Sequence, residues 1–314
     1  MTQPPYRLQA AWRGIGRGWH GFFHEPIDAR VPALVRIGYS LVLLVNLAVL
    51  YPNLHTWFGE QGVLPKEVAR KISDPDTWHF QWLPSDAAGL TICYWAFVAQ
   101  AICLLLGLAT RLNAVCVFAW LLAFQCRNPL IYDSEDIVFR LIGFFLMLMP
   151  SGVAWSGHAA LRRLISPASL SPAPRLVSAW GLRLLQIQMA VIFLSAALCK
   201  LRGETWIDGT ALYYVARLDW FGKFPLPTGL FQTPWIVCLL TWTVVLVEFT
   251  TPLLVWFRET RRPMLLLALV FHLSNEYSMH LFLFHWIMLV GWLAFVLPED
   301  WEWIKRLTGP TKSR

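Results

Sequence analysis

The stretch Gly181–Gly209, GLRLLQIQMAVIFLSAALCKLRGETWIDG, joins a long apolar run to a polar turn that contains a tryptophan. About 20 apolar residues are enough for an α-helix to cross the hydrocarbon core of a membrane. Lys200 lies at the end of the run, directly before the turn. The stretch therefore predicts a membrane-spanning helix, and it leaves open whether Lys200 anchors that helix at the interface or carries out chemistry there.

The composition of the whole chain is typical of a membrane protein. Of its 314 residues, 57% are hydrophobic and 14% are charged, whereas soluble domains have about 25% charged residues. We expect an all-α integral membrane protein with a single bundle of about eight transmembrane helices, and no internal repeat. The expected spans are residues 33–51, 88–108, 112–127, 137–155, 177–200, 233–257, 263–277 and 280–297, the last two divided by the polar segment SNEYSMH.

The distribution of basic residues predicts the orientation of these spans. With the N-terminus in the cytoplasm, fifteen Lys and Arg residues fall on the inner side and seven on the outer side. Because basic residues are enriched on the cytoplasmic side, this favours a multi-pass protein of the cell membrane with both termini inside. Residues 1–27 are then a cytoplasmic interfacial segment, residues 28–300 the transmembrane domain and residues 301–314 a cytoplasmic basic tail. The net charge of +7 needs no nucleic acid as a partner.

Ionisable groups inside the predicted spans are the candidates for chemistry, since such groups are costly in a membrane. Lys200 can act as a general base, because burial disfavours the ammonium form of a lysine. Gln186 lies about 40° from Lys200 around the helix, so both should point into the bundle. Glu248 needs a polar or basic partner from another span, and His272 should form a hydrogen-bonded pair with Glu276. Arg36, Arg140 and Arg183 should reach head groups or helix ends.

Two further features have an ordinary structural interpretation beside a functional one. The outer connection CRNPLIYDSEDIVFR places Asn128 and Asp136 at the mouth between two spans, where a solvated acidic loop is equally expected. Asn128 before a proline is also a good turn former. The six cysteines are scattered through apolar segments, which predicts neither a disulfide framework nor a metal site.

Several pieces, in this order, resemble the transmembrane domain of the vitamin K-dependent gamma-carboxylase family, also called the horizontally transferred transmembrane domain family. They are RIGYSLVLLVNLAVLYPNL, WFGEQGVLP, RNPLIYDSEDIVFRLIGFFLMLMP, QIQMAVIFLSAALCKLRGETWIDGTAL, VEFTTPLLVWFRETRRP and FHLSNEYSMHLFLF, and they extend over about residues 28–300. Each piece is moderately specific, and their order and spacing add to the resemblance.

The resemblance implies a function for Lys200. In that family the lysine before the W-x-x-G turn is the base that deprotonates vitamin K hydroquinone, which then reacts with O₂ and leads to uptake of CO₂ by a glutamyl side chain. It implies a menaquinol-type lipid quinol as cofactor and a peptide or protein as substrate. We expect Lys200, His272 and Glu248 to be catalytic, and Asn128, Asp136, Trp206 and Gln186 to bind substrate, with Trp206 as part of a lid over an apolar pocket.

The chain also departs from that family. The carboxylases have a large extramembrane C-terminal domain that docks the protein substrate, whereas this chain ends at Arg314, and Ser134 stands where the family has a glycine. Small bacterial relatives include proteins implicated in maturing a secreted peptide toxin. A non-enzymatic membrane protein that binds, matures or exports a peptide, and a scaffold for a partner complex, are therefore the alternatives to a quinol-dependent enzyme.

Overall fold

A computed structural model describes residues 6–72, 82–165, 175–218, 222–224 and 226–308, which are nearly all α-helical. Residues 309–314 of the predicted basic tail lie outside these described residues. Four long helices of the first part of the chain pack together: α2 (Arg30–Leu50), α5 (Ala87–Leu106), α6 (Thr110–Arg127) and α7 (Ser134–Leu148). The second part contributes α9 (Trp180–Lys200), α13 (Pro234–Leu254), α14 (Arg258–Ser278) and α15 (Phe284–Trp292), the last continued by a 3₁₀ helix, η4 (Leu293–Phe295).

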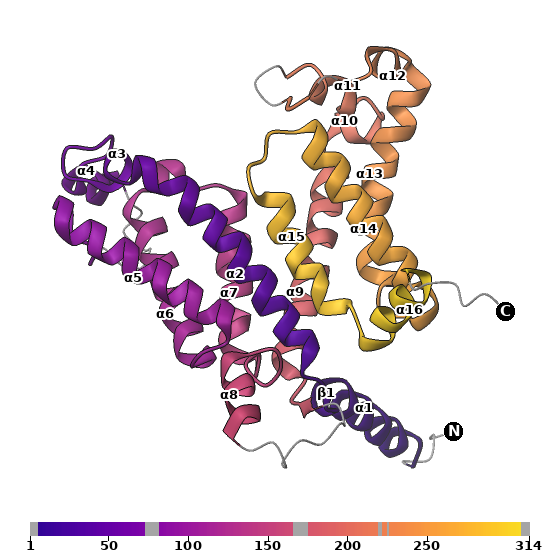
Figure 1. Ribbon diagram of the computed structural model, residues 1–314. Coiled ribbons are helices and arrows are strands. Elements are labelled where there is room, and N and C mark those ends of the chain that lie inside the picture. The colour runs from indigo at the N-terminus through magenta and orange to yellow at the C-terminus, as the bar shows by residue number, and fades with distance from the viewer. Residues whose placement is uncertain (1–5, 73–81, 166–174, 219–221, 225, 309–314) are drawn as a thin grey trace.

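Short helices lie at the ends of these two groups (Figure 1). The helix α1 (Tyr6–His24) precedes α2 and occupies most of the segment 1–27 that the sequence predicts to be interfacial. The other short elements are η1 (Tyr51–Asn53), α3 (Leu54–Phe58), α4 (Lys66–Ile72), η2 (Pro129–Ile131), α8 (Gly157–Ile165), α10 (Glu204–Ile207), α11 (Ala211–Val215), α12 (Thr228–Gln232) and α16 (Pro298–Thr308). Two strands of two residues each, β1 (Ile27–Asp28) and β2 (Leu176–Val177), pair antiparallel just before α2 and α9.

Every predicted span coincides with a helix, but the helices differ in how well they suit a membrane. Four segments are long and apolar enough to cross one, namely Arg30–Phe58, Ala87–Leu106, Trp180–Lys200 and Pro234–Leu254. The helices α6, α7, α14 and α15 fall short of these four in length or in hydropathy. The predicted division of the last two is present, since α14 ends at Ser278 and α15 begins at Phe284.

The two groups of four helices are built alike, so the expectation of no internal repeat is wrong. Within the first group α2 packs on α5 and α7, and α6 packs on both α5 and α7; within the second, α9 packs on α13 and α15, and α14 packs on both α13 and α15. Residues 34–50 and 184–200 are buried, half-buried or exposed in the same order at every position. Three contacts join the two groups: α7 packs on α15, α7 packs on α9, and α15 packs on α2.

A buried polar side chain holds each group together at the same place. Arg36 on α2 is fully buried and donates hydrogen bonds to the carbonyl oxygens of Ser151 (2.8 Å) and Trp155 (2.5 Å), in the segment that follows α7. Gln186 on α9 lies 150 positions later and donates to the carbonyl oxygen of Ala294 (2.7 Å), which follows α15. Arg36 therefore does not extend to lipid head groups as the sequence predicted, because its guanidinium satisfies backbone carbonyls inside the protein.

Candidate functional site

Lys200 and Glu248 form an ion pair between two of the long helices. Buried positions on α13 recur at helical spacing, and Glu248 shares that face with Thr241 and Val245. Lys200 is the last residue of α9, and its Nζ lies 2.7 Å from each carboxylate oxygen of Glu248. The side chains are 23% and 10% exposed, respectively. The prediction that Glu248 pairs with a basic group from another span is confirmed.

Trp206 covers this pair, because the helix α10 follows closely after Lys200. The peptide of Gly203 turns the chain, since its N–H donates to the Lys200 carbonyl oxygen at 2.9 Å. The Lys200 Nζ then lies 5.2 Å from the centroid of the Trp206 ring, a distance suited to a cation–π contact. The Lys200 Nζ is thus in contact with a carboxylate on one helix and with an aromatic ring from the turn that follows α9.

A cavity of about 300 Å³ lies against this pair, and we call it the base cavity. Apolar side chains make up most of its wall. It brings together four of the residues that the sequence singled out, Lys200, Trp206, Glu248 and His272. Its other lining residues are Ile192, Phe193, Ala196, Leu212, Val215, Val244, Phe271, Asn275, Met279, Leu281, Phe284, His285 and Met288.

Two histidines face each other in the wall of the base cavity. The Nδ1 atoms of His272 and His285 are 3.1 Å apart, so one ring donates a hydrogen bond to the other. Both rings are almost completely buried, and neither Nε2 has a hydrogen-bond partner. The predicted pairing of His272 with Glu276 is wrong, because Glu276 accepts from Lys223 at 2.5 Å instead. His285 was missed as a site residue; it lies on a different helix, and no spacing in the sequence relates it to His272.

Gln186 is not part of this site. It lies nearly four turns before Lys200 on α9. Both the nitrogen and the oxygen of its side-chain amide form hydrogen bonds within the protein. The side chain donates to Ala294, as described above, and accepts a hydrogen bond from Arg183 at 2.9 Å. Gln186 is on a buried face of α9, as predicted, but at the opposite end of the helix from the base cavity.

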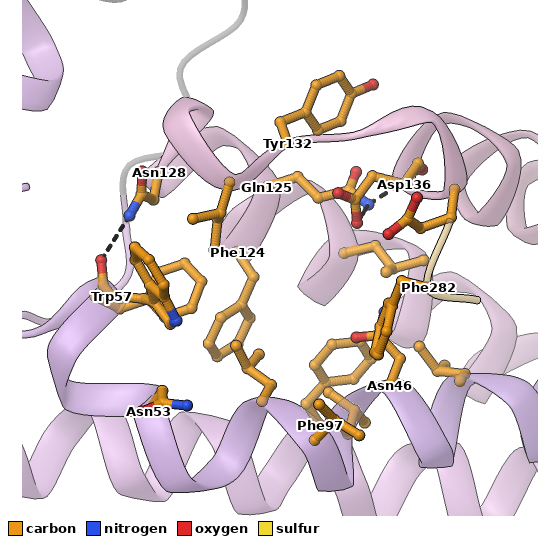
Figure 2. A pocket seen from close by; sticks show the side chains of 18 residues that line it. Asn46, Asn53, Trp57, Phe97, Phe124, Gln125, Asn128, Tyr132, Asp136 and Phe282 are labelled. Carbon is orange, nitrogen blue, oxygen red and sulfur yellow. Dashed lines mark hydrogen bonds between the residues drawn. The ribbon is translucent and has the colours of Figure 1, made fainter. Parts of the chain in front are cut away.

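Asn128 and Asp136 line a separate cavity of about 240 Å³, which we call the outer cavity (Figure 2). Asn128 donates to the carbonyl oxygen of Trp57 (2.8 Å) and accepts from the N–H of Leu130 (3.1 Å). Asp136 accepts from Gln125 (3.1 Å) and closes a capping box at the start of α7. Both residues therefore position the backbone around the cavity, and the structure does not bring them to Lys200.

Most of the remaining residues of the outer cavity come from the first group of helices and from the short elements η1, α3 and η2 beside them. Aromatic rings form much of the wall, as Figure 2 shows for Trp57, Phe97 and Phe124. Polar side chains that the sequence did not single out also line it, including Asn46, Asn53, Gln125 and Glu135. Phe282, in the turn between α14 and α15, belongs to this wall, whereas its neighbours Leu281 and Phe284 line the base cavity. The two cavities thus lie on either side of this turn.

Comparison with known proteins agrees with this architecture. The model of the HTTM domain matches residues 24–301, which include both groups of helices. The chain belongs to the HTTM domain family.

Two curated relatives are proteins of Bacillus subtilis (strain 168). The chain is similar to the uncharacterized protein YitO, with 24% identity over 163 residues, which are 51% of this chain and 51% of YitO. It is also similar to the sporulation-delaying protein SdpB, with 29% identity over 188 residues, which are 58% of this chain and 57% of SdpB. The chain therefore spans little more than half the length of the curated relatives it matches. No solved structure matches it.

Proposed function

We propose that this HTTM-domain protein is a multi-pass membrane enzyme that uses the Lys200–Glu248 pair as a general base towards a lipid quinol. The observation that supports the proposal best is the ion pair itself, placed in the wall of a largely apolar cavity. An ion pair that only strengthened the fold would not need a cavity beside it. Charged groups on a cavity wall, by contrast, are typical of sites that handle protons.

The lining of the base cavity fits an aromatic ring with polar substituents. The apolar side chains suit the ring, and Lys200 and Glu248 supply a donor and an acceptor for ring oxygens. A bound menaquinol-type quinol would supply acidic hydroxyl groups and the electrons for reaction with O₂. Carboxylation of a glutamyl side chain with CO₂ is the reaction class that the family resemblance favours.

An apolar groove supports access of a lipid to the base cavity. A second cavity of about 480 Å³ lies between α11, α12, α13 and α14. It shares six lining residues with the base cavity: Leu212, Val215, Val244, Phe271, Asn275 and Met279. A ligand whose ring occupies the base cavity could therefore place an apolar tail in this groove.

Lys200 and Glu248 would carry the proton away from the hydroxyl group of a bound ligand. Glu248 holds the Lys200 ammonium, and transfer of a proton from Nζ to the carboxylate leaves a neutral amine beside a carboxylic acid. That neutral form is favoured when water is excluded, because a low dielectric penalises separated charges. The Lys200 amine can then accept a proton from an acidic hydroxyl, while Trp206 and the apolar wall keep water away.

The proposal includes the topology that the chemistry needs. We place about eight spans in the cell membrane, four from each group of helices, with both termini in the cytoplasm. Lys200 then lies near the outer surface, as does the outer cavity. The inner-side excess of Lys and Arg supports this orientation.

The test is quinol-dependent O₂ uptake by the purified protein in reconstituted membranes that contain menaquinol. We expect uptake by the native protein and none by Lys200→Arg, because a guanidinium keeps its charge but does not give up its proton. Equal rates for the two proteins would exclude Lys200 as the base. Absence of uptake by either would favour the alternative function.

That alternative is a membrane protein that binds, matures or exports a peptide without redox chemistry. One observation favours it: the outer cavity carries carboxylates and amides and, among the described residues, no lining lysine that could act as a base. The two functions are compatible in one molecule, because the cavities are separate.

A further inference from the structure

The two cavities occupy equivalent positions in the two groups of helices. On α2 and α9, the lining residues Leu43, Asn46 and Leu50 lie 150 positions before Phe193, Ala196 and Lys200. On α6 and α14, Phe124, Gln125 and Asn128 lie 147 positions before Phe271, His272 and Asn275. The outer cavity is therefore the counterpart of the base cavity.

A conserved contact supports this equivalence at the level of single atoms. Gln125 donates to Asp136 across 3.1 Å, from α6 to α7. At the corresponding place between α14 and α15, His272 and His285 are also 3.1 Å apart. Each cavity thus has one hydrogen-bonded pair in its wall, and the residue types differ.

The charged residues that line the two cavities differ. Leu50 stands where the base cavity has Lys200, and Asp136 stands where it has His285. No Lys, Arg or His lines the outer cavity among the described residues, although the Arg140 guanidinium lies beside it, 3.0 Å from Gln125. The base cavity thus contains a lysine paired with a carboxylate, whereas the outer cavity has carboxylates in its wall.

Glu135 supplies the carboxylate that a cation bound in the outer cavity would meet. It lies on α7 in the wall of the outer cavity, and its exposed fraction is 7%. No side chain or backbone group of another described residue donates a hydrogen bond to its carboxylate, and the charged groups that act on it are the carboxylates of Asp133 and Asp136. Burying an ionised carboxylate without a counter-charge is costly, and a bound cation would remove that cost.

Two amides and several rings complete the surroundings of this carboxylate. Asn46 and Asn53 line the cavity, and their side chains make no hydrogen bond within the part of the chain that the structure describes. Their amide oxygens are free to accept hydrogen bonds from a ligand. Trp57 adds a ring face of the kind that attracts organic cations (Figure 2), whereas the Tyr132 ring is already covered by the Arg140 guanidinium, 4.9 Å from its centroid.

We infer that the outer cavity binds the ammonium group of a peptide, carried by a lysine side chain or by the N-terminal residue. Its volume of about 240 Å³ is below the roughly 300–1,000 Å³ of sites for drug-sized ligands, so it holds a single residue rather than a longer segment. An amine-bearing phospholipid fits less well, since its phosphate would meet carboxylates and no basic residue. The inference does not depend on the chemistry proposed for Lys200.

Calorimetric titration of the purified protein in detergent micelles tests this inference. The probe is acetyl-Phe-Lys-amide, and the comparison is the same peptide with its lysine side chain acetylated. We expect the acetylated peptide to bind at least about tenfold more weakly, because the charge-assisted hydrogen bonds are lost. We expect Glu135→Gln to weaken binding of the charged peptide by a similar factor. Glu67→Gln, an exposed site on α4 outside both cavities, should leave binding unchanged.

Two measurements keep the test decisive. Thermal unfolding will show whether Glu135→Gln is folded. If Glu135→Gln is not folded, Asn46→Leu replaces it, because this variant removes one acceptor on another helix and should also weaken binding of the charged peptide. Equal binding of both peptides, equal binding by Glu135→Gln and the native protein, or no binding of the charged peptide would overturn the inference. Binding of a short-chain phosphatidylethanolamine in place of the peptide would overturn it in favour of a lipid. Loss of O₂ uptake in Lys200→Arg bears on the base cavity alone.

Discussion

Lys200 and Glu248 each determine the charge of the other. A lysine at the end of an apolar helix is ordinarily free to extend to the interface, but here its Nζ is bound by both oxygens of one carboxylate. A carboxylate in the middle of an apolar helix would ordinarily be neutral, but here an ammonium opposes it. The pair must therefore be altered together if its chemistry is to be separated from its effect on the fold.

We predict that Glu248→Gln destabilises the protein by about 3 kcal/mol, the low end of the range for breaking a buried ion pair. Lys200 would otherwise be left without its counter-charge in an apolar wall. The double variant Lys200→Met with Glu248→Leu should recover most of the lost stability, since neither charge remains. Thermal unfolding in detergent measures both, and a double variant less stable than Glu248→Gln would contradict this account.

The histidine pair makes a prediction about tautomers. Because the Nδ1 atoms of His272 and His285 share one hydrogen bond, one neutral ring must carry its proton on Nδ1 and the other on Nε2. Nitrogen-15 NMR of histidine-labelled protein should show one ring of each tautomer at neutral pH. His285→Phe should destabilise the fold by about 1–3 kcal/mol, because it leaves a buried ring nitrogen unpaired. Two Nε2 tautomers would rule out the direct hydrogen bond.

At the scale of the element, α16 depends on one carboxylate. Asp300 accepts hydrogen bonds from Arg262 (2.7 Å) and Arg261 (3.1 Å), both on α14. Burial by itself would raise the pKa of Asp300, but the hydrogen bonds from Arg262 and Arg261 outweigh it and hold the pKa below its ordinary value. This contact therefore joins the C-terminal helix to the bundle through charge.

The sign of the shift predicts an acid-sensitive α16. A carboxylate whose pKa is lowered by folding stabilises the folded state above its ordinary pKa, and this stabilisation is lost as the pH falls through the lowered value. The protection of α16 amides against hydrogen exchange, relative to their intrinsic rates, should therefore fall below about pH 4. In Asp300→Asn, this protection should be lower at neutral pH and should lose most of its pH dependence. An unchanged protection factor in native α16 between pH 5 and pH 3 would contradict the prediction.

The sequence predicted the elements better than their partners. Apolar runs between polar turns indicated all eight long helices, because hydropathy is a property of a segment alone. The Lys200–Glu248 contact was only partly predictable: the cost of a lone carboxylate required a partner for Glu248 but did not identify it. The partner of His272 was predicted wrongly, since helical spacing favours Glu276 on the same helix whereas His285 comes from the next one.

At the scale of the whole molecule, the repeat could not be predicted from residue types. Arg36 and Gln186 perform the same task, as do the pairs Gln125–Asp136 and His272–His285, yet none of these positions shares a side chain. What the two groups share is burial order and packing, which only the folded chain displays. The sequence therefore singled out residues of both cavities, including Asn128 and Asp136 of the outer cavity, but it did not show that the two cavities correspond.

The topology yields a prediction that labelling can check. With eight spans and both termini inside, Ala160 on α8 faces the cytoplasm and Val215 on α11 faces outward. Single cysteines at these two positions, in a background without the native cysteines, should react with an impermeant thiol reagent from opposite sides of the membrane. Reaction of both from the same side would require an even number of spans between them and would contradict this topology.

The strand pair β1–β2 joins the starts of the two groups of helices at equivalent positions. Ile27 is paired with Val177, which is its own counterpart 150 positions later. Two identical chains make this kind of self-matching contact when they associate about a two-fold axis. The two groups therefore meet as the subunits of a homodimer do, and a chain built in this way has two equivalent cavity positions whose side chains can differ.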